Sequence, residues 1–279
     1  MIKLIALDLD GTLLNSEKQI SPVNERALRQ CIDRGIYVVP ATGRTVDGIP
    51  RELLELPGVR YAITANGAMV EDIKNGQVIS QCLLSCKQTL GLMELAKGYD
   101  CIYDPYIERR GISEPRFIDH LEEYGLSPQI CRLVRQTRDV VPDSMERVRE
   151  LNRPAEKVNL FFACEEERQK VKKVLERRKD IVVSSSLYNN LEINAVGATK
   201  GDGILRLASY LYLDQKETMA FGDGGNDVSM IEKAGIGVAM GNSCEELKQA
   251  ADYVTLTNDE DGVASAIEKL VFHAADERA

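Results

Sequence analysis

The chain has 279 residues, of which 44% are hydrophobic and 28% charged, a composition typical of a globular protein. Typical domains have about 100–200 residues, so this length predicts one large domain or two of medium size. The net charge of −9 and the absence of tryptophan argue against binding to nucleic acid or to an anionic membrane. No apolar run approaches the ~20 residues that cross a bilayer, and the N-terminus lacks the apolar segment of a signal peptide. We therefore expect a cytoplasmic protein.

The cysteines and histidines do not show the spacing of a metal site or of a histidine-dependent catalytic site. The seven cysteines are odd in number and scattered, and Cys82 and Cys86 have no second pair or histidine nearby to complete a zinc site. We therefore expect reduced thiols. The chain has two histidines, His120 and His273, so a reaction that depends on a histidine base has few candidates.

The N-terminal segment begins with a strand pattern followed by a helix pattern. Residues 2–8 form an apolar run with β character, typical of a strand that is covered on both faces. Ser21 is a good N-cap and Pro22 a good first helical residue, while Gly35 marks the end of the helix.

Two further strands are expected in the first eighty residues. They cover residues 36–44 and 61–70, and the second contains an Asn66-Gly67 turn signal. We interpret that turn mainly as structural. Strands and helices that alternate at this spacing predict right-handed crossovers and a parallel sheet.

The same alternation returns near the C-terminus, where the patterns predict four helices and three strands. The helices cover residues 201–213, 226–235, 244–251 and 261–272, and the strands cover residues 218–224, 235–241 and 252–256.

The middle of the chain differs from both ends. Residues 85–186 mix helix and strand patterns, and no apolar run among them is followed by polar or acidic residues that could form a site. Residues 165–179 are rich in charges of both signs and carry an apolar stripe, as expected of a solvated helix. We therefore predict an inserted α+β domain at 85–186, with residues 1–84 and 187–279 forming one core.

Small polar or acidic residues follow three of the predicted strands. In a parallel sheet the carboxyl ends of the strands lie at one edge, where ligands bind. An Asp-Gly pair can mark a simple turn, but a turn does not explain an aspartate at the end of an apolar strand. The residues concerned are Asp8 and Asp10, Thr42, and Asp223 with Asn226 and Asp227.

Carboxylates without a histidine or cysteine ligand form a hard oxygen site that suits Mg²⁺. A carboxylate beside Mg²⁺ can attack phosphorus, and a second carboxyl group can serve as general acid and base. Lys200 lies at the predicted start of a helix, where the helix dipole disfavours a positive charge. We therefore expect an anion beside it.

Four motifs in this order resemble those of the haloacid dehalogenase superfamily. They are DLDGT (8–12), ATGR (41–44), GATKGDG (197–203) and GDGGND (222–227). The predicted inserted domain of about a hundred residues (85–186) lies between the second and third motifs, as in Cof-type phosphatases with a large inserted cap. The resemblance implies an α/β fold, in which a Rossmann-like parallel-sheet core with helices on both faces carries an α+β cap.

The resemblance also implies a role for individual residues. Asp8 would be the nucleophile and Asp10 the general acid/base. Mg²⁺ would be held by the Asp8 carboxylate, the Asp10 backbone carbonyl and Asp223. Phosphate would be bound by the Leu9 backbone, Thr42, Gly43, Lys200 and Asn226, with Asp227, Thr12 and Arg44 in supporting positions.

These features together predict a Mg²⁺-dependent phosphohydrolase of small phosphorylated metabolites, with a sugar phosphate as the first candidate and a phosphorylated cofactor as the second. We expect a monomer or a weak homo-oligomer. A phosphotransferase or mutase would use the same nucleophile, and a phosphate-accepting switch would share the acidic residues.

In the cap, Tyr106, Glu108, Arg109 and Arg110 are candidate substrate contacts.

Overall fold

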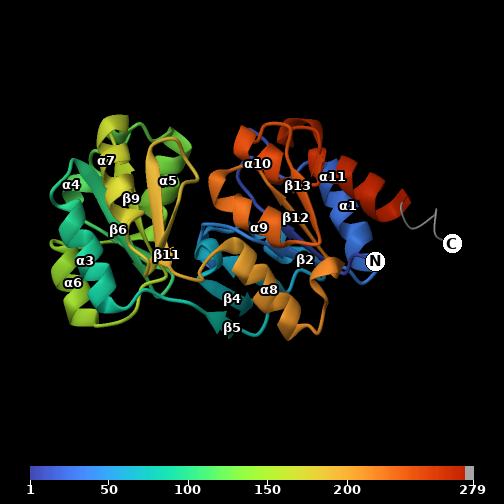
Figure 1. The fold of residues 1–279 in the computed structure, drawn as a ribbon, viewed down its shortest axis with the longest axis horizontal. Coiled ribbons are helices and arrows are strands. Elements are labelled where there is room, and N and C mark those ends of the chain that lie inside the picture. The colour runs from blue at the N-terminus through green and yellow to red at the C-terminus, as the bar shows by residue number, and fades with distance from the viewer. Residues whose placement is uncertain (274–279) are drawn as a thin grey trace. The chain divides into compact units, whose positions relative to one another are not determined.

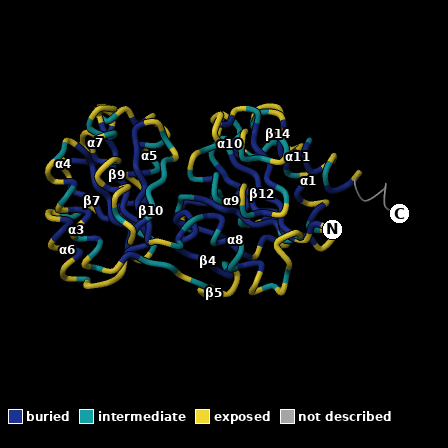
Figure 2. The backbone as a smooth tube through the Cα atoms, in the orientation of Figure 1, coloured by how far each residue is buried: buried dark blue, intermediate teal, exposed yellow. Residues whose placement is uncertain are grey.

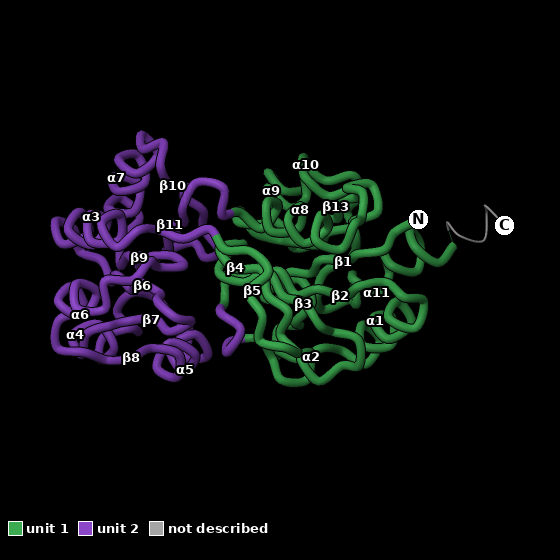
Figure 3. Tube along the Cα trace, turned by 90° about the horizontal axis from the view of Figure 1, so that it is seen from below, with its two compact units in different colours: residues 1–44, 49–81, 199–279 green, residues 45–48, 82–198 purple. Residues whose placement is uncertain are grey.

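The computed structural model describes residues 1–273, which form two compact units (Figure 3). Of the described residues, unit 1 contains 1–44, 49–81 and 199–273, and unit 2 contains 45–48 and 82–198. The boundaries of the core and the inserted domain that we inferred from sequence remain a proposal.

Unit 1 is built on a parallel sheet of five strands in the order β14-β13-β12-β1-β2. Figure 1 labels β2, β12 and β13 of this sheet. In the register of this sheet, Leu7 at the end of β1 lies between Phe221 and Pro40. The residues that follow these strand ends therefore emerge at the same edge. The strands are β1 (Leu4–Leu7), β2 (Tyr37–Pro40), β12 (Thr218–Gly222), β13 (Ile236–Ala239) and β14 (Tyr253–Val254).

Helices cover both faces of this sheet, as the apolar strands predict. Ile5 and Leu7 pack in one hydrophobic core, while Leu4 and Ala6 pack in the other, because successive side chains of a strand point to opposite faces. The sheet is therefore buried on both sides (Figure 2). The first core includes α1 (Pro22–Asp33) and α11 (Gly262–Ile267), and the second includes α8 (Lys200–Tyr210), α9 (Val228–Lys233) and α10 (Glu245–Ala250).

The start and end of α1 confirm the sequence interpretation. Ser21 is the N-cap, and its hydroxyl accepts a hydrogen bond from the backbone N–H of Asn24. Pro22 is the first helical residue, where its missing N–H removes no helical hydrogen bond. Gly35 follows the helix with φ +76°.

The prediction of one parallel strand over residues 61–70 is wrong. Residues 65–67 turn the chain back, so that β3 and β4 pair as an antiparallel hairpin, with β5 next to β4. An isolated parallel bridge between Ala41 and Ile63 links β3 to the end of β2. The elements of this part are α2 (Arg51–Glu55), β3 (Tyr61–Thr64), β4 (Met69–Asp72) and β5 (Gln77–Gln81).

Unit 2 contains a mostly antiparallel sheet of six strands, in the order β10-β11-β9-β6-β7-β8, with helices α3 and α7 against β9. The strands are β6 (Cys101–Ile107), β7 (Arg110–Ser113), β8 (Arg138–Val140), β9 (Lys157–Phe162), β10 (Ile181–Ser184) and β11 (Asn190–Ala195). The helices are α3 (Cys86–Ala96), α4 (Pro115–Ile118), α5 (Pro128–Thr137), α6 (Ser144–Leu151) and α7 (Glu165–Leu175).

The two faces of this second sheet differ in chemistry. One face is apolar and includes Tyr103, Leu160 and Ile193. On the other face, the register places Asp104 beside Asn159, and Asn159 beside Glu192. We call the following buried residues the polar sheet face: Asp104, Tyr106, Ser113, Arg138, Lys157, Asn159 and Glu192.

Within residues 1–273, none of the helices combines the length and apolar character needed to cross a membrane. All seven cysteines lie in this described part and all are free thiols.

Candidate active site

The strand ends of unit 1 bring three aspartates together. Asp8 follows β1, and its backbone N–H donates to Phe221 of β12 at 3.0 Å. Carboxylate oxygens of Asp8, Asp223 and Asp227 all lie within 4.8 Å of one another. Asp8 and Asp227 are buried and Asp223 is partly buried. Residues about 215 positions apart in sequence thus form one acidic cluster.

Lys200 provides the positive charge of the cluster. Its Nζ donates to Asp8 Oδ1 at 2.5 Å and to Asp227 Oδ1 at 2.6 Å, and the side chain is fully buried. Burial lowers the pKa of Lys200, but Asp227 and Asp8 outweigh it and hold the pKa above its ordinary value. Lys200 is the first residue of α8, and Thr199 caps that helix by accepting from the Asp202 N–H. The anions beside Lys200 in this structure are the Asp8 and Asp227 carboxylates.

Hydrogen bonds with Asp227 and Thr12 hold Asp223 and its loop in place. Asp227 Oδ2 accepts from the backbone N–H groups of Asp223 and Gly224, each at 2.9 Å. The Thr12 hydroxyl donates to Asp223 Oδ1 at 3.0 Å. Thr12 therefore orients Asp223, while Asp227 fixes both Lys200 and the loop that carries Asp223.

The negative charge of the cluster exceeds its positive charge. Burial, opposed by Lys200 and reinforced by Asp227 and Asp223, raises the pKa of Asp8 well above its ordinary value. Burial and the neighbouring Asp227 raise the pKa of Asp223 to about 7. One lysine does not neutralise three close carboxylates, and an all-oxygen donor set fits a hard divalent cation.

Asp10 lies at the edge of the cluster in an ion-paired state. Arg44 binds both of its carboxylate oxygens, with Nε–Oδ2 at 2.9 Å and a terminal nitrogen to Oδ1 at 2.8 Å, and Lys18 adds a contact at 2.9 Å. Burial raises the pKa of Asp10, but Arg44 and Lys18 outweigh it, so that the pKa is lowered overall. Sequence reasoning missed Lys18, since nothing distinguishes it from an ordinary surface lysine.

The remaining motif residues lie on the loops around the cluster. Thr42 is buried, and its hydroxyl accepts from the Arg44 N–H at 3.1 Å, which places Gly43 within a tight turn. Leu9 is fully buried between the two aspartates of the first motif. Asn226 donates through Nδ2 to Asn66 Oδ1 at 3.2 Å, a partner that our sequence analysis did not assign to the site.

Comparison with known proteins shows to which family this chain belongs. The model of the haloacid dehalogenase-like hydrolases matches residues 5–267. The chain belongs to the haloacid dehalogenase-like hydrolases. Its relatives include the phosphatase YwpJ of Bacillus subtilis, 34% identical over 97% of this chain and 100% of the relative. The 5-amino-6-(5-phospho-D-ribitylamino)uracil phosphatase YcsE of the same organism is 34% identical over 95% of this chain and 94% of the relative.

Solved structures of haloacid dehalogenase-like hydrolases share the whole fold. A hydrolase of this family from B. subtilis has a TM-score of 0.86 at 32% identity, covering 97% of this chain and 100% of the other. The subclass IIB sugar phosphatase BT4131 has a TM-score of 0.80 at 26% identity, covering 96% and 98%. The protein is an enzyme of the phosphatase class, with an α/β core and a cap built on an antiparallel sheet.

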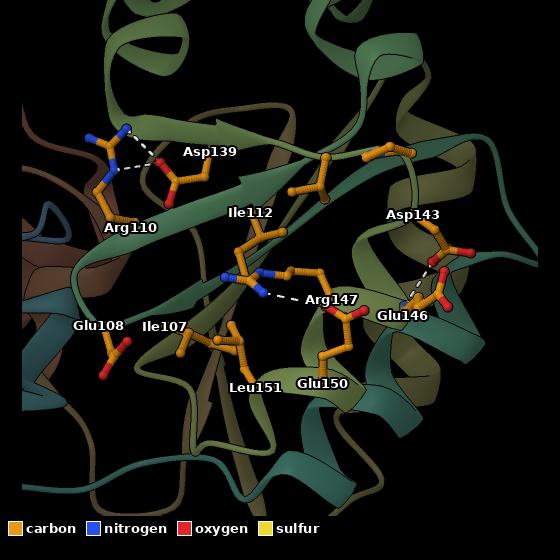
Figure 4. A pocket seen from close by; sticks show the side chains of 12 residues that line it. Ile107, Glu108, Arg110, Ile112, Asp139, Asp143, Glu146, Arg147, Glu150 and Leu151 are labelled. Carbon is orange, nitrogen blue, oxygen red and sulfur yellow. Dashed lines mark hydrogen bonds and ion pairs between the residues drawn. The ribbon is translucent and has the colours of Figure 1, made fainter.

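Unit 2 of this hydrolase, its cap, contains a cavity of about 590 Å³ beside α6 (Figure 4). Glu108 and Arg110, two of the candidate substrate contacts, line it, and Arg110 pairs with Asp139 at 3.0 Å. Tyr106 instead lies on the polar sheet face, where burial raises its pKa. The backbone N–H of Arg109 donates to Glu156 at 2.8 Å. The cavity contains none of the motif residues.

Proposed function

We propose that the protein is a Mg²⁺-dependent phosphohydrolase that cleaves small phosphorylated metabolites through an aspartyl-phosphate on Asp8. The observation that carries this proposal is the buried Lys200 ammonium between Asp8 and Asp227, beside Asp223. A nucleophilic carboxylate, a fixed cation and a cation-binding carboxylate in one cluster are the groups that phosphoryl transfer needs.

The acidic cluster fits a magnesium ion. The Asp8 carboxylate, the Asp10 backbone carbonyl and Asp223 would hold it, because carboxylate and carbonyl oxygens are the ligands that Mg²⁺ prefers and the carboxylates of Asp8, Asp223 and Asp227 lie close together. When bound, Mg²⁺ supplies positive charge to the phosphoryl oxygens as the reaction proceeds.

In the first half of the reaction, an Asp8 carboxylate oxygen attacks phosphorus and the bond from phosphorus to the leaving oxygen breaks. Asp10 in its protonated form gives a proton to that oxygen. In the second half, water attacks the aspartyl-phosphate, Asp10 takes the proton from water, and Asp8 is released with inorganic phosphate. Lys200 stabilises the negative charge throughout.

Asp10 has to change partners between these steps. Its bidentate pair with Arg44 and its contact with Lys18 favour the carboxylate, which is the form that acts as a base. Donation to the leaving oxygen requires the protonated form, so Asp10 acts as an acid only after it has left Arg44. Arg44 therefore sets which of the two roles Asp10 can play.

The phosphate group of the substrate would be bound by donors on the surrounding loops. Lys200, the Asn226 amide and the Thr42 hydroxyl supply side-chain donors, and the backbone N–H groups of Leu9 and Gly43 supply the others. Such fixed donors lower the energy of a charged transition state because they need no reorganisation.

The cap favours a polyhydroxylated substrate, with a sugar phosphate first. On the polar sheet face, three buried atoms have no hydrogen-bond partner among the described residues: Asp104 Oδ1, Ser113 Oγ and Asn159 Oδ1. These atoms have almost no accessible surface, so this face has to open before the hydroxyl groups of a ligand can supply the missing donors. The names of the relatives YcsE and BT4131 describe a phospho-ribityl and a sugar phosphatase, whose substrates carry such hydroxyl groups.

Phosphate release from a panel of phosphorylated sugars, nucleotides and vitamin cofactors tests the proposed function. We expect release with Mg²⁺ and none with EDTA. Asp8→Asn should lower kcat about 10³-fold or more with the fold intact, because the amide cannot act as the nucleophile. Asp33→Asn, which changes an exposed aspartate of α1, is the matched control.

Normal turnover by Asp8→Asn would contradict the mechanism. Adding a polyol acceptor separates hydrolysis from transfer, because a phosphotransferase forms phosphorylated acceptor while free phosphate does not rise in proportion.

A further inference from the structure

Residues 65–67 form a turn with unusual backbone geometry. Ala65, Asn66 and Gly67 have φ values of +48°, +59° and +90° in succession, and all three are buried. The Ala65 side chain makes this region of backbone space unfavourable, whereas asparagine and glycine tolerate it better. Such a conformation persists where the surrounding structure imposes it, often near a functional site.

The backbone of this turn contacts the loop of the second motif. The Ala65 N–H donates to the Arg44 carbonyl at 2.9 Å, and the Asn66 N–H donates to the Thr42 carbonyl at 3.0 Å. The turn thereby fixes the backbone on both sides of Gly43.

The same turn packs against the start of α8. Gly67 lies so close that a Cβ there would collide with the Thr199 carbonyl, directly before Lys200. The Gly67 carbonyl accepts from Arg206, one and a half turns further along α8. Together with the Thr42 contacts, this packing joins the second and third motifs through residues that belong to neither.

The Asn66 side chain reaches the fourth motif. Asn66 Oδ1 accepts from Asn226 Nδ2 at 3.2 Å. An amide nitrogen carries two hydrogens, so one can bind Asn66 while the other is directed to a phosphate oxygen. Asparagine suits this position because it tolerates positive φ and offers a short side-chain acceptor.

We propose that Asn66 is a positioning residue, which orients the Asn226 amide for phosphate binding. This inference rests on the proposed function, in which Asn226 binds the phosphate group. Asn66 itself acts through Asn226 and through the turn that joins three of the four motifs.

A double-mutant cycle tests the inference, with inorganic phosphate as the probe and p-nitrophenyl phosphate as the assay substrate. Asn66→Gly removes the acceptor and keeps the positive φ accessible. We expect it to raise the inhibition constant of phosphate about five- to tenfold in the wild-type background. In the Asn226→Ala background it should change that constant less than twofold, because no amide remains to be oriented.

Two further variants keep the test decisive. Asn152→Gly makes the same change at another left-handed asparagine, the exposed C-cap of α6, and should leave the inhibition constant unchanged. Asn66→Asp retains the acceptor and adds a negative charge. Its effect on phosphate binding should therefore be equal in both backgrounds, whether or not Asn66→Gly folds.

Equal effects of Asn66→Gly in the two backgrounds would overturn the assignment and leave the proposed function standing. So would an Asn66→Asp effect confined to the chain with Asn226. If neither Asn226→Ala nor Lys200→Ala weakens phosphate binding, the proposed function fails, and the inference about Asn66 fails with it.

Discussion

Lys200 carries its charge at the start of α8, where the helix dipole disfavours a cation. Two carboxylates at 2.5 and 2.6 Å reverse that preference and keep the ammonium protonated without contact with water. Burial, reinforced by the neighbouring carboxylates, in turn raises the pKa of Asp8 above its ordinary value. The chemistry of the site therefore depends on a charge balance that one further cation would complete.

We predict that the metal-free protein loses stability as the pH rises. The pKa of Asp223 is raised from 3.8 to about 7, and that of Asp8 is raised as well. Between pH 3.8 and about 7, Asp223 of the folded protein retains a proton that it has lost in the unfolded chain. The contribution of Asp223 to the free energy of unfolding should therefore fall as the pH increases from about 4 to about 7 and then level off.

Thermal unfolding in EDTA from pH 4 to 8 measures this effect. Asp223→Asn is the control, because it retains an acceptor for Thr12 and cannot titrate, so it should flatten the slope. The same variant should raise the Mg²⁺ concentration needed for half-maximal activity. Equal slopes for the two proteins, or an unchanged Mg²⁺ requirement, would show that Asp223 does not carry this charge.

At the scale of elements, the turn after β1 decides the position of Asp223. Gly11 has φ +82°, and a Cβ there would collide with the Asp223 carboxylate. The glycine thus permits both the backbone conformation and the close approach of Asp223, the residue that follows β12.

We predict that Gly11→Ala abolishes most of the metal-dependent activity, because the new methyl group displaces the Asp223 carboxylate. Gly35→Ala is the matched control, since Gly35 has φ +76° with no atom within 4 Å of an added Cβ. Both variants should lose about 1–2 kcal/mol of stability from the left-handed backbone. Calorimetry and a Mg²⁺ titration of activity separate the two effects, and equal activity losses in both would reject the steric explanation.

Elements with local signals were predictable and those with long-range partners were not. Ser21, Pro22 and Gly35 specify α1 through contacts within a few residues. The segment 61–72 also carries a local turn signal, but whether its strands pair in parallel or antiparallel fashion depends on neighbours elsewhere in the chain. In the cap, α5, α6 and β11 carried no signal strong enough for us to assign them.

At the scale of the whole molecule, we assign the reaction to the catalytic core and substrate recognition to the cap. The proposed nucleophile, metal-binding carboxylates and phosphate-binding residues all belong to unit 1, whereas the buried polar atoms without a described partner that we assign to substrate recognition belong to unit 2. Chemistry and selectivity should therefore respond to different substitutions.

We predict that Ser113→Ala raises the KM for sugar phosphates about two- to tenfold and leaves the KM for p-nitrophenyl phosphate unchanged. The Ser113 hydroxyl is fully buried and has no partner among the described residues, so its loss should not lower the stability of the free protein. Ser144→Ala is the control, because the Ser144 hydroxyl donates to Glu114 at 2.6 Å. It should lower the melting temperature and leave selectivity unchanged, and a parallel shift of both KM values in Ser113→Ala would refute the assignment.

The sequence by itself determined the parallel core, the order of the four motifs and the presence of an acidic site with a lysine, because these depend on local patterns and on the rule that parallel strands end at one edge. Only the tertiary structure decided that Arg44 and Lys18 hold Asp10, that Thr12 holds Asp223, and that Asn66 holds Asn226. These pairs join side chains whose separation is set by loop conformation and packing, and no residue type or spacing encodes such a distance.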